Sequence, residues 1–117
     1  HILSSDEKDA KWQFAAYLVY SKLETDTLEK ALLELFENSD EYTSRRALGS
    51  LGVLKSTHAE AACEKAWNTG HQYQRMMALS VLYEIGSEGL PGYLKLAEED
   101  GRKYIVQRAN GIKNTLK

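Results

Sequence analysis

Apolar residues recur along the chain at intervals of three and four, the spacing of one face of an α-helix. The first such stripe consists of Ala16, Val19, Tyr20 and Leu23, and similar stripes follow as far as the C-terminal residues. Turn-forming residues separate them. The pattern predicts an all-α fold of about seven helices, over residues 6–23, 26–37, 41–54, 57–68, 72–86, 89–99 and 102–116.

The sequence matches itself when it is shifted by 31 residues. One column of the match is Ala16, Ala47, Ala78 and Ala109. Other columns place Tyr42 with Tyr73 and Tyr104, and Leu32 with Cys63 and Leu94. Each unit has two helices with one apolar stripe apiece, so units bury their stripes only by stacking. We therefore expect one domain over 1–117, an α-solenoid with repeats at about 6–37, 38–68, 69–99 and a partial 100–117.

Polar residues at the breaks predict how the helices begin. Ser4–Glu7, Asp26–Glu29 and Thr57–Glu60 have the spacing of capping boxes, in which each end satisfies a free backbone N–H of the other. Pro91 falls in a first turn, where its missing N–H costs little. Gly111 lies inside the last predicted helix and weakens it.

Two repeated features have structural explanations. The tyrosine column fits a hydrophobic staple, with Tyr42 before the cap and Ala47 at the fourth helical position. An open alternative is a row of exposed phenols available to a partner. Gly49 and Gly52 lie within a helical stripe, where we expect them to allow close helix packing rather than to hold a phosphate.

The stretch Ile85–Asp100, which reads IGSEGLPGYLKLAEED, resembles the HEAT-like repeats found in phycobilin lyases. That family ends a first helix with Ile-Gly and starts the second with Leu-Pro. The stretch Arg46–Gly52 is similar to the Ala-Leu-Gly motif in the first helix of that family's repeats. The resemblance covers about three and a half repeats. The chain departs from the family at the Val-Arg pair, which often forms an Asp–Arg ladder. Here Tyr42–Arg46 and Tyr73–Met77 stand in its place.

The resemblance implies a right-handed solenoid of antiparallel helix pairs, in which the second helices line a concave, partner-binding surface. On these helices the positions opposite the buried stripes are the expected protein contacts: Lys30, Leu33, Glu34, Glu37, Glu64, Lys65, Lys95 and Leu96. Leu33 and Leu96 are apolar where solvent is expected, which favours a partner. The expected function is therefore a non-enzymatic scaffold for another protein, of unknown identity. The alternatives are nucleic-acid binding through the basic C-terminal end and a bilin lyase or chaperone role.

Charge and cysteine content limit the kinds of functional site that the chain is expected to have. Residues 1–41 carry a net charge of −6 and residues 42–117 a net charge of +4, which predicts either solvated helix faces or a basic landing surface. Cys63 is the only cysteine and shares a column with two leucines, so we expect a buried apolar residue rather than a nucleophile. His58 begins a helix, and neither it nor His71 has metal-ligand spacing. No catalytic residue, cofactor or metal site is expected.

The first predicted helix is apolar on every side, with Phe14 and Leu18 opposite its Ala16 stripe. A terminal repeat normally has a polar outer face. Either the chain is an excerpt of a longer solenoid, or this helix pairs with a second chain; weak self-association through Phe14 and Leu18 is the expectation. No secretory or membrane-spanning segment is visible, so a cytoplasmic location with no membrane partner is expected.

Overall fold

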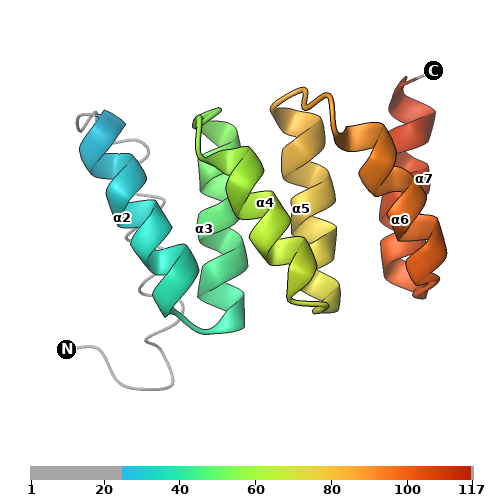
Figure 1. The fold of residues 1–117 in the computed structure, drawn as a ribbon, viewed down its shortest axis with the longest axis horizontal. Helices are drawn as coiled ribbons and strands as arrows, with labels where there is room; N and C mark the ends of the chain where they lie inside the picture. The colour runs from blue at the N-terminus through green and yellow to red at the C-terminus, as the bar shows by residue number, and fades with distance from the viewer. Residues whose placement is uncertain (1–24, 117) are drawn as a thin grey trace.

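The computed structural model describes residues 25–116, and all the regular structure among them is helical. Six helices follow one another along the chain, each antiparallel to the one before it (Figure 1). They are α2 (Thr25–Asn38), α3 (Glu41–Val53), α4 (Ala59–Asn68), α5 (Gln72–Glu84), α6 (Leu90–Asp100) and α7 (Lys103–Leu116). The predicted helix over 6–23, with Phe14 and Leu18, lies outside the described residues.

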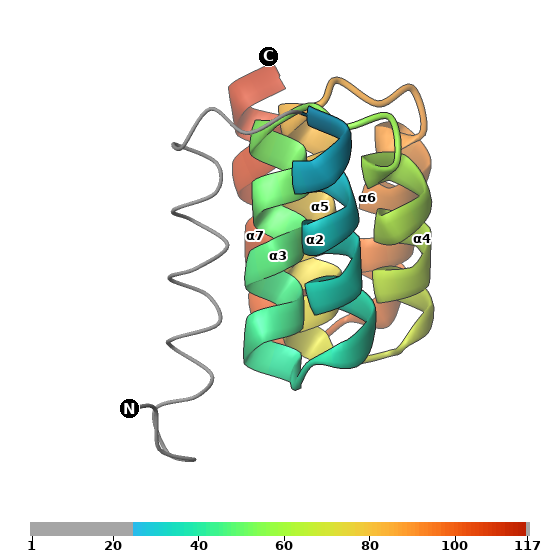
Figure 2. The same cartoon turned by 90° about the vertical axis from the view of Figure 1, so that its left-hand side faces the viewer.

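The six helices form two layers (Figure 2). The first-helix layer consists of α3, α5 and α7, in which α5 packs against both of the others. The second-helix layer consists of α2, α4 and α6, and each of these packs on the first layer. No Cα atom of α4 lies within 8 Å of one in α2 or α6. The second helices are therefore separated by side chains alone.

The core lies between the layers and follows the columns of the repeat. Ala47, Ala78 and Ala109 are fully buried at equivalent positions of α3, α5 and α7. Leu32, Cys63 and Leu94 occupy one column of the second layer and are also buried. Their burial confirms the alanine column at these three positions and the apolar role of Cys63, while Ala16, the first member of the column, lies outside the described residues.

Glycine lets α3 and α5 approach closely, as predicted. A Cβ atom on Gly49 would lie 3.3 Å from the sulfur of Met77. One on Gly52 would lie 3.0 Å from both Cγ methyls of Val81. Such distances are well inside ordinary van der Waals contact. The two glycines therefore permit the close approach of α3 and α5.

Helix starts differ from the capping boxes that the sequence suggested. The Ser4–Glu7 box lies outside the described residues. The box at Asp26 is wrong, because α2 already begins at Thr25 and Asp26 lies in its first turn. The box at Thr57 is also wrong: α4 begins at Ala59, after His58. A turn replaces the box, in which Ser56 Oγ accepts a hydrogen bond from the His58 backbone N–H.

The hydrophobic staple is wrong for the same reason. Asp40 is the N-cap of α3 and its side chain accepts from the Thr43 N–H at 2.9 Å, so Tyr42 lies inside the helix and not before the cap. Tyr73 and Tyr104 are likewise inside their helices, with 43% and 51% of their surface exposed. The tyrosines form a partly exposed row on the first-helix layer, where Arg45 lies over the rings of Tyr42 and Tyr73.

Two further expectations about helices are confirmed. Pro91 lies in the first turn of α6. Helix α7 continues through Gly111 to Leu116. Its start is set by Gly101, which ends α6 in the left-handed conformation with φ of 77° that glycine adopts without strain.

Candidate functional site

All eight predicted contact residues lie in the second-helix layer. Seven of them are exposed, and Leu96 keeps 42% of its surface open. Leu33 differs, because it is half-buried and packs against the core. The structure therefore brings Leu33, Glu37 and Lys65 together between α2 and α4, while Lys95 and Leu96 lie apart on α6.

A groove of about 150 Å³ separates α2 from α4. Its floor is apolar and consists of Leu33 and Phe36 from α2 and of Ala61 and Ala62 from α4. Alanine at positions 61 and 62 adds little side-chain volume to the space between α2 and α4. An apolar floor between charged rims is the usual form of a peptide-binding surface.

Next to the groove lies a larger cleft of about 500 Å³ at the ends of α2 and α4. Phe36, Glu37 and Lys65 line both spaces, so the two are adjacent. The remaining walls come from turns and helix starts: Ser39, Glu41, Ser44, Thr69, His71 and Gln74. Together these residues form what we call the α2/α4 site.

Hydrogen bonds fix the polar wall of this cleft. The buried side chain of Gln74 donates from α5 to the backbone oxygen and the carboxylate of Glu41, at 3.5 and 3.4 Å. Arg45 holds the same carboxylate at 3.0 Å. Ser44 Oγ donates to the Phe36 carbonyl at 2.7 Å. The Glu41 side of the cleft is thus linked to α5 through Gln74 and to its own helix through Arg45.

The opposite rim is held more loosely. Lys65 Nζ donates to Glu37 Oε2 at 2.8 Å and bridges α4 to α2 across the cleft. The two side chains are 65% and 46% exposed, so water competes with the bond. His71 caps α5 by accepting from the Tyr73 N–H at its Nδ1 atom, at 3.1 Å. This leaves the Nε2 edge of the neutral ring as a donor.

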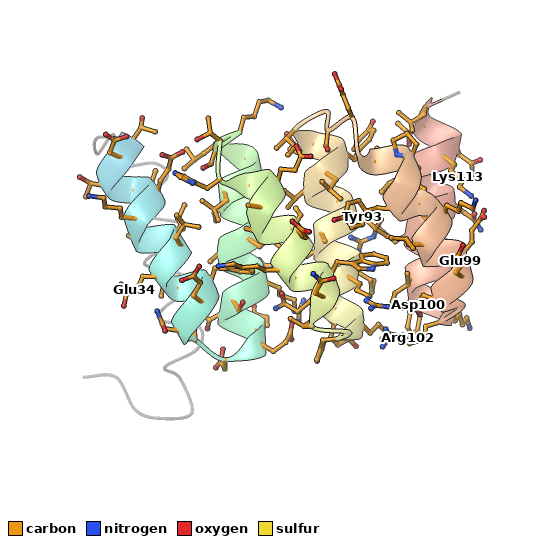
Figure 3. The ribbon with its side chains drawn as sticks, in the orientation of Figure 1. Glu34, Tyr93, Glu99, Asp100, Arg102 and Lys113 are labelled. Atoms are coloured by element: carbon orange, nitrogen blue, oxygen red, sulfur yellow. The ribbon has the colours of Figure 1, made fainter. Side chains whose placement is uncertain are left out.

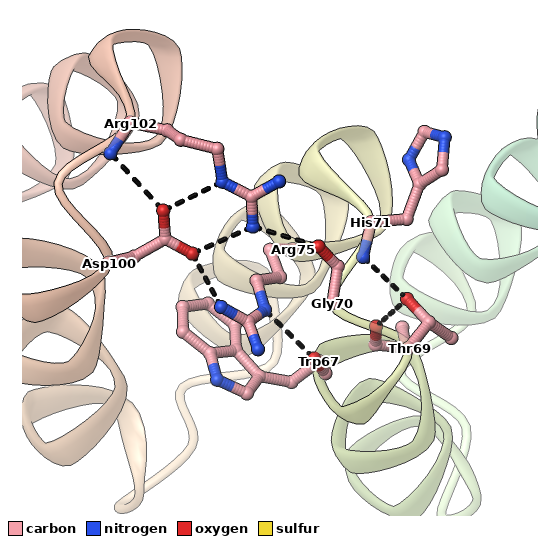
Figure 4. Close-up of polar contacts among 8 residues, drawn as sticks. Trp67, Thr69, Gly70, His71, Arg75, Asp100 and Arg102 are labelled. Carbon is pink, nitrogen blue, oxygen red and sulfur yellow. Dashed lines mark hydrogen bonds and ion pairs between the residues drawn. The ribbon is translucent and has the colours of Figure 1, made fainter.

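A separate polar cluster fastens the last repeat to the one before it (Figure 4). The carboxylate of Asp100, 3% exposed, accepts from Arg75 and at 2.8 Å from Arg102. Arg102 also donates to the Gly70 carbonyl at 2.8 Å. Arg75 donates to the Trp67 carbonyl at 2.9 Å and lies over the Trp67 ring. An Asp–Arg connection between repeats therefore exists, although the Val-Arg pair of the HEAT-like pattern is missing.

Burial and neighbouring charged groups shift the pKa of Asp100 in this cluster and the pKa of Cys63 in the core. The hydrogen bond from Arg102, opposed by burial and helped by Arg75, holds the pKa of Asp100 far below its usual range. In the core, burial and the nearby Glu60 raise the pKa of Cys63 to about 12. Its thiol donates weakly to the Ala78 carbonyl at 3.6 Å. Asp100 therefore serves as a structural anion, and Cys63 stays protonated.

The basic residues of the C-terminal helix are also engaged. Arg108 donates to the Met76 carbonyl at 3.2 Å and to the Ser80 hydroxyl. Lys113 pairs with Glu98 of α6. Arg108 thus ties α7 to α5, and Arg102, just before α7, is bound to Asp100, whereas the Lys113–Glu98 pair is exposed. These bonds within the fold are structural, and a surface that binds an anionic partner does not require them.

Charge is divided between the two layers. Helices α2, α4 and α6 contain nine acidic and three basic residues, whereas α3, α5 and α7 contain two acidic and six basic residues. Exposed acidic side chains such as Glu34 and Glu99 project from the second helices (Figure 3). Burial is the main cause that raises the pKa of Tyr93, and the nearby carboxylates of Glu64 and Glu60 raise it further. Within each repeat the first helix is therefore the more basic and the second helix the more acidic.

No family model, curated protein or solved structure matches the chain. Within residues 25–116, no helix is long and apolar enough to cross a membrane, and no group of histidine, cysteine, aspartate or glutamate has the arrangement of a metal site.

Sequence reasoning missed much of the cleft wall. Ser39, Glu41, His71 and Gln74 were not among the predicted contacts, because only the second helices were considered. One signal was available: Asp40 and His71 are 31 residues apart, directly after turns. Equivalent turns of adjacent repeats meet in space, so residues beside them were candidates for a shared site.

Proposed function

We propose that this chain is a right-handed α-solenoid of HEAT-like helix pairs and serves as a non-enzymatic scaffold that binds another protein at the α2/α4 site. The repeat and the two layers support the solenoid. One observation carries the binding role: a groove with an apolar floor next to a cleft lined mostly by polar residues, on the layer whose backbones stay more than 8 Å apart.

Nucleic-acid binding receives less support. That function relies on cations free to contact phosphates. The C-terminal Arg102, Arg108 and Lys113 instead bond within the fold, and the second-helix layer is acidic. Bilin handling rests on the family resemblance alone.

A peptide-display selection against the immobilised chain tests the proposed function. Selected peptides should lose about tenfold or more in affinity for Ala61→Arg, which fills the groove. The matched control is Gly92→Arg on α6, where an added Cβ meets nothing within 4 Å. Both variants add the same charge, so only occlusion of the groove separates them. Equal binding to the two variants would contradict the proposal.

A further inference from the structure

We infer that the second-helix layer has another interaction surface, between α4 and α6, whose partner is a basic protein segment with an arginine beside an apolar residue. The surface consists of Glu60 and Glu64 of α4 and of Tyr93 and Leu96 of α6, and we call it the α4/α6 surface. None of these residues lines the α2/α4 site, so the inference goes beyond the proposed function.

Aromatic packing brings the two helix faces together. Tyr93 packs edge-on against Trp67 of α4, with the ring centroids 5.4 Å apart. At the start of α6, a Cβ atom on Gly89 would lie 3.7 Å from Glu60 Oε2 and 3.9 Å from the Tyr93 ring. After burial, the charge of Glu64 and then that of Glu60 raises the pKa of Tyr93, so both carboxylates lie close to this phenol. The side chains of α4 and α6 therefore form one continuous face.

The negative charge of this surface is not balanced within the described part of the chain. Glu60 and Glu64 are exposed and form no ion pair among residues 25–116. They are four residues apart on one helix, a spacing at which like charges repel. The N-terminus of α6 offsets part of the charge on Glu60, whereas Glu64 lies one turn further along α4. A cation placed beside the two carboxylates relieves their repulsion.

The preceding pair of second helices has a cation that this pair lacks. Between α2 and α4, Lys65 Nζ bonds to Glu37 Oε2 at 2.8 Å. The residue 31 positions after Lys65 is Leu96, so α6 has an apolar side chain at the place where α4 has its bridging cation. The carboxylates of the α4/α6 surface therefore receive no cation from the next repeat, and a partner can supply one.

The side chains of the surface define the chemistry of the partner. A guanidinium group can bond to two carboxylates and also lie against a phenol ring. Leu96 is 42% exposed and lies three residues after Tyr93, so the two are neighbours on the surface of α6. They offer an apolar contact next to the carboxylates. An arginine followed or preceded by a large apolar residue satisfies both parts, and the acidic layer attracts such a segment.

The test uses a fluorescein-labelled peptide of alternating arginine and leucine, with binding measured by fluorescence anisotropy on the full chain at low salt. The peptide should bind, and the double variant Glu60→Gln, Glu64→Gln should bind it about tenfold more weakly. The matched control is Glu29→Gln, Glu34→Gln, which removes the same charge from α2 and should change the affinity less than about twofold. Absence of binding, or equal losses in the two double variants, would overturn the inference.

A second pair of variants tests the position of Leu96. Leu96→Lys gives α6 a cation where the preceding repeat has Lys65 and removes the apolar contact, so the affinity for the peptide should fall about tenfold. The control is Leu116→Lys, which makes the same change at a leucine of α7 that is 56% exposed and should bind like the wild type. Both leucines are largely open to solvent, so both variants should keep the fold. Equal affinities of the two lysine variants would overturn the inference.

Discussion

The two layers of the domain come from one 31-residue repeat and yet differ in packing and in the use of charge. In the first-helix layer, Gly49 and Gly52 let α3 and α5 touch, and basic side chains such as Arg75 and Arg108 bond to neighbouring repeats. In the second-helix layer, the backbones lie more than 8 Å apart and meet only through side chains such as Trp67 and Tyr93, and acidic side chains face solvent. One layer thus holds the stack together, which leaves the other free to present a groove.

The largest expected effect breaks the close packing of the first layer. Gly52→Leu should lower the free energy of unfolding by about 3 kcal/mol, because its Cβ would already crowd the stiff Val81 side chain. The measurement is urea denaturation. Gly92→Leu in the second layer is the control and should be neutral or stabilising, since its Cβ meets open space. An equal loss of unfolding free energy in the two variants would refute the difference in packing between the two layers.

Next in size is the cluster that joins the repeats. Asp100→Asn should cost about 2 kcal/mol at neutral pH, because it removes a buried anion bonded to two arginines. Glu98→Gln, which breaks the exposed pair with Lys113, should cost less than about 0.5 kcal/mol. Chemical denaturation of both variants measures the difference.

The Asp100 contribution should depend on pH with a definite sign. Its pKa in the folded chain lies below the ordinary value near 4, so the ionised form stabilises the fold above about pH 4. Stability should fall as the pH drops below that value, and the gap between the wild type and Asp100→Asn should narrow. A gap that is constant from neutral pH to about pH 2 would contradict this assignment.

A smaller loss is expected at the C-terminal helix. Arg108→Met removes hydrogen bonds to the Met76 carbonyl and Ser80, and should cost about 1 kcal/mol. Lys103→Met removes an equal charge from an exposed position and should stay within about 0.5 kcal/mol of the wild type. Thermal melting can compare them. Matching melting temperatures would mean that Arg108 has no structural role.

The smallest effect concerns the second layer. Glu37→Gln and Lys65→Gln should each change stability by less than about 0.5 kcal/mol, because the pair is exposed. Denaturant titration provides the check. A loss above about 1 kcal/mol in either variant would show that this layer, too, depends on its ion pairs.

Sequence periodicity was sufficient for the helices and the core. The alanine column of Ala47, Ala78 and Ala109 and the buried Cys63 followed from the repeat, because helical spacing dictates which face is covered. Cap residues were less reliable: Thr57 and Tyr42 fit sequence motifs that the backbone did not adopt. Several side chains can satisfy the same free N–H groups, so local pattern alone leaves the first helical residue open.

The candidate site was predicted only in part. Leu33, Glu37 and Lys65 were identified from their place opposite the buried stripes. Glu41, His71 and Gln74 were missed, because they belong to turns and helices of the other layer. The apolar stripe of a helix shows only which face of that one helix is buried, whereas this cleft is formed by the ends of four helices.

By itself the sequence determined the repeat, the helices and the buried columns, since these depend on residue type and on spacing along one chain. Only the tertiary structure decided where the charges meet. Asp100 bonds to Arg75 across 25 residues and Lys65 to Glu37 across 28, distances over which no local rule applies. Stacking brings equivalent turns together, and from that juxtaposition come both the tie between repeats and the cleft.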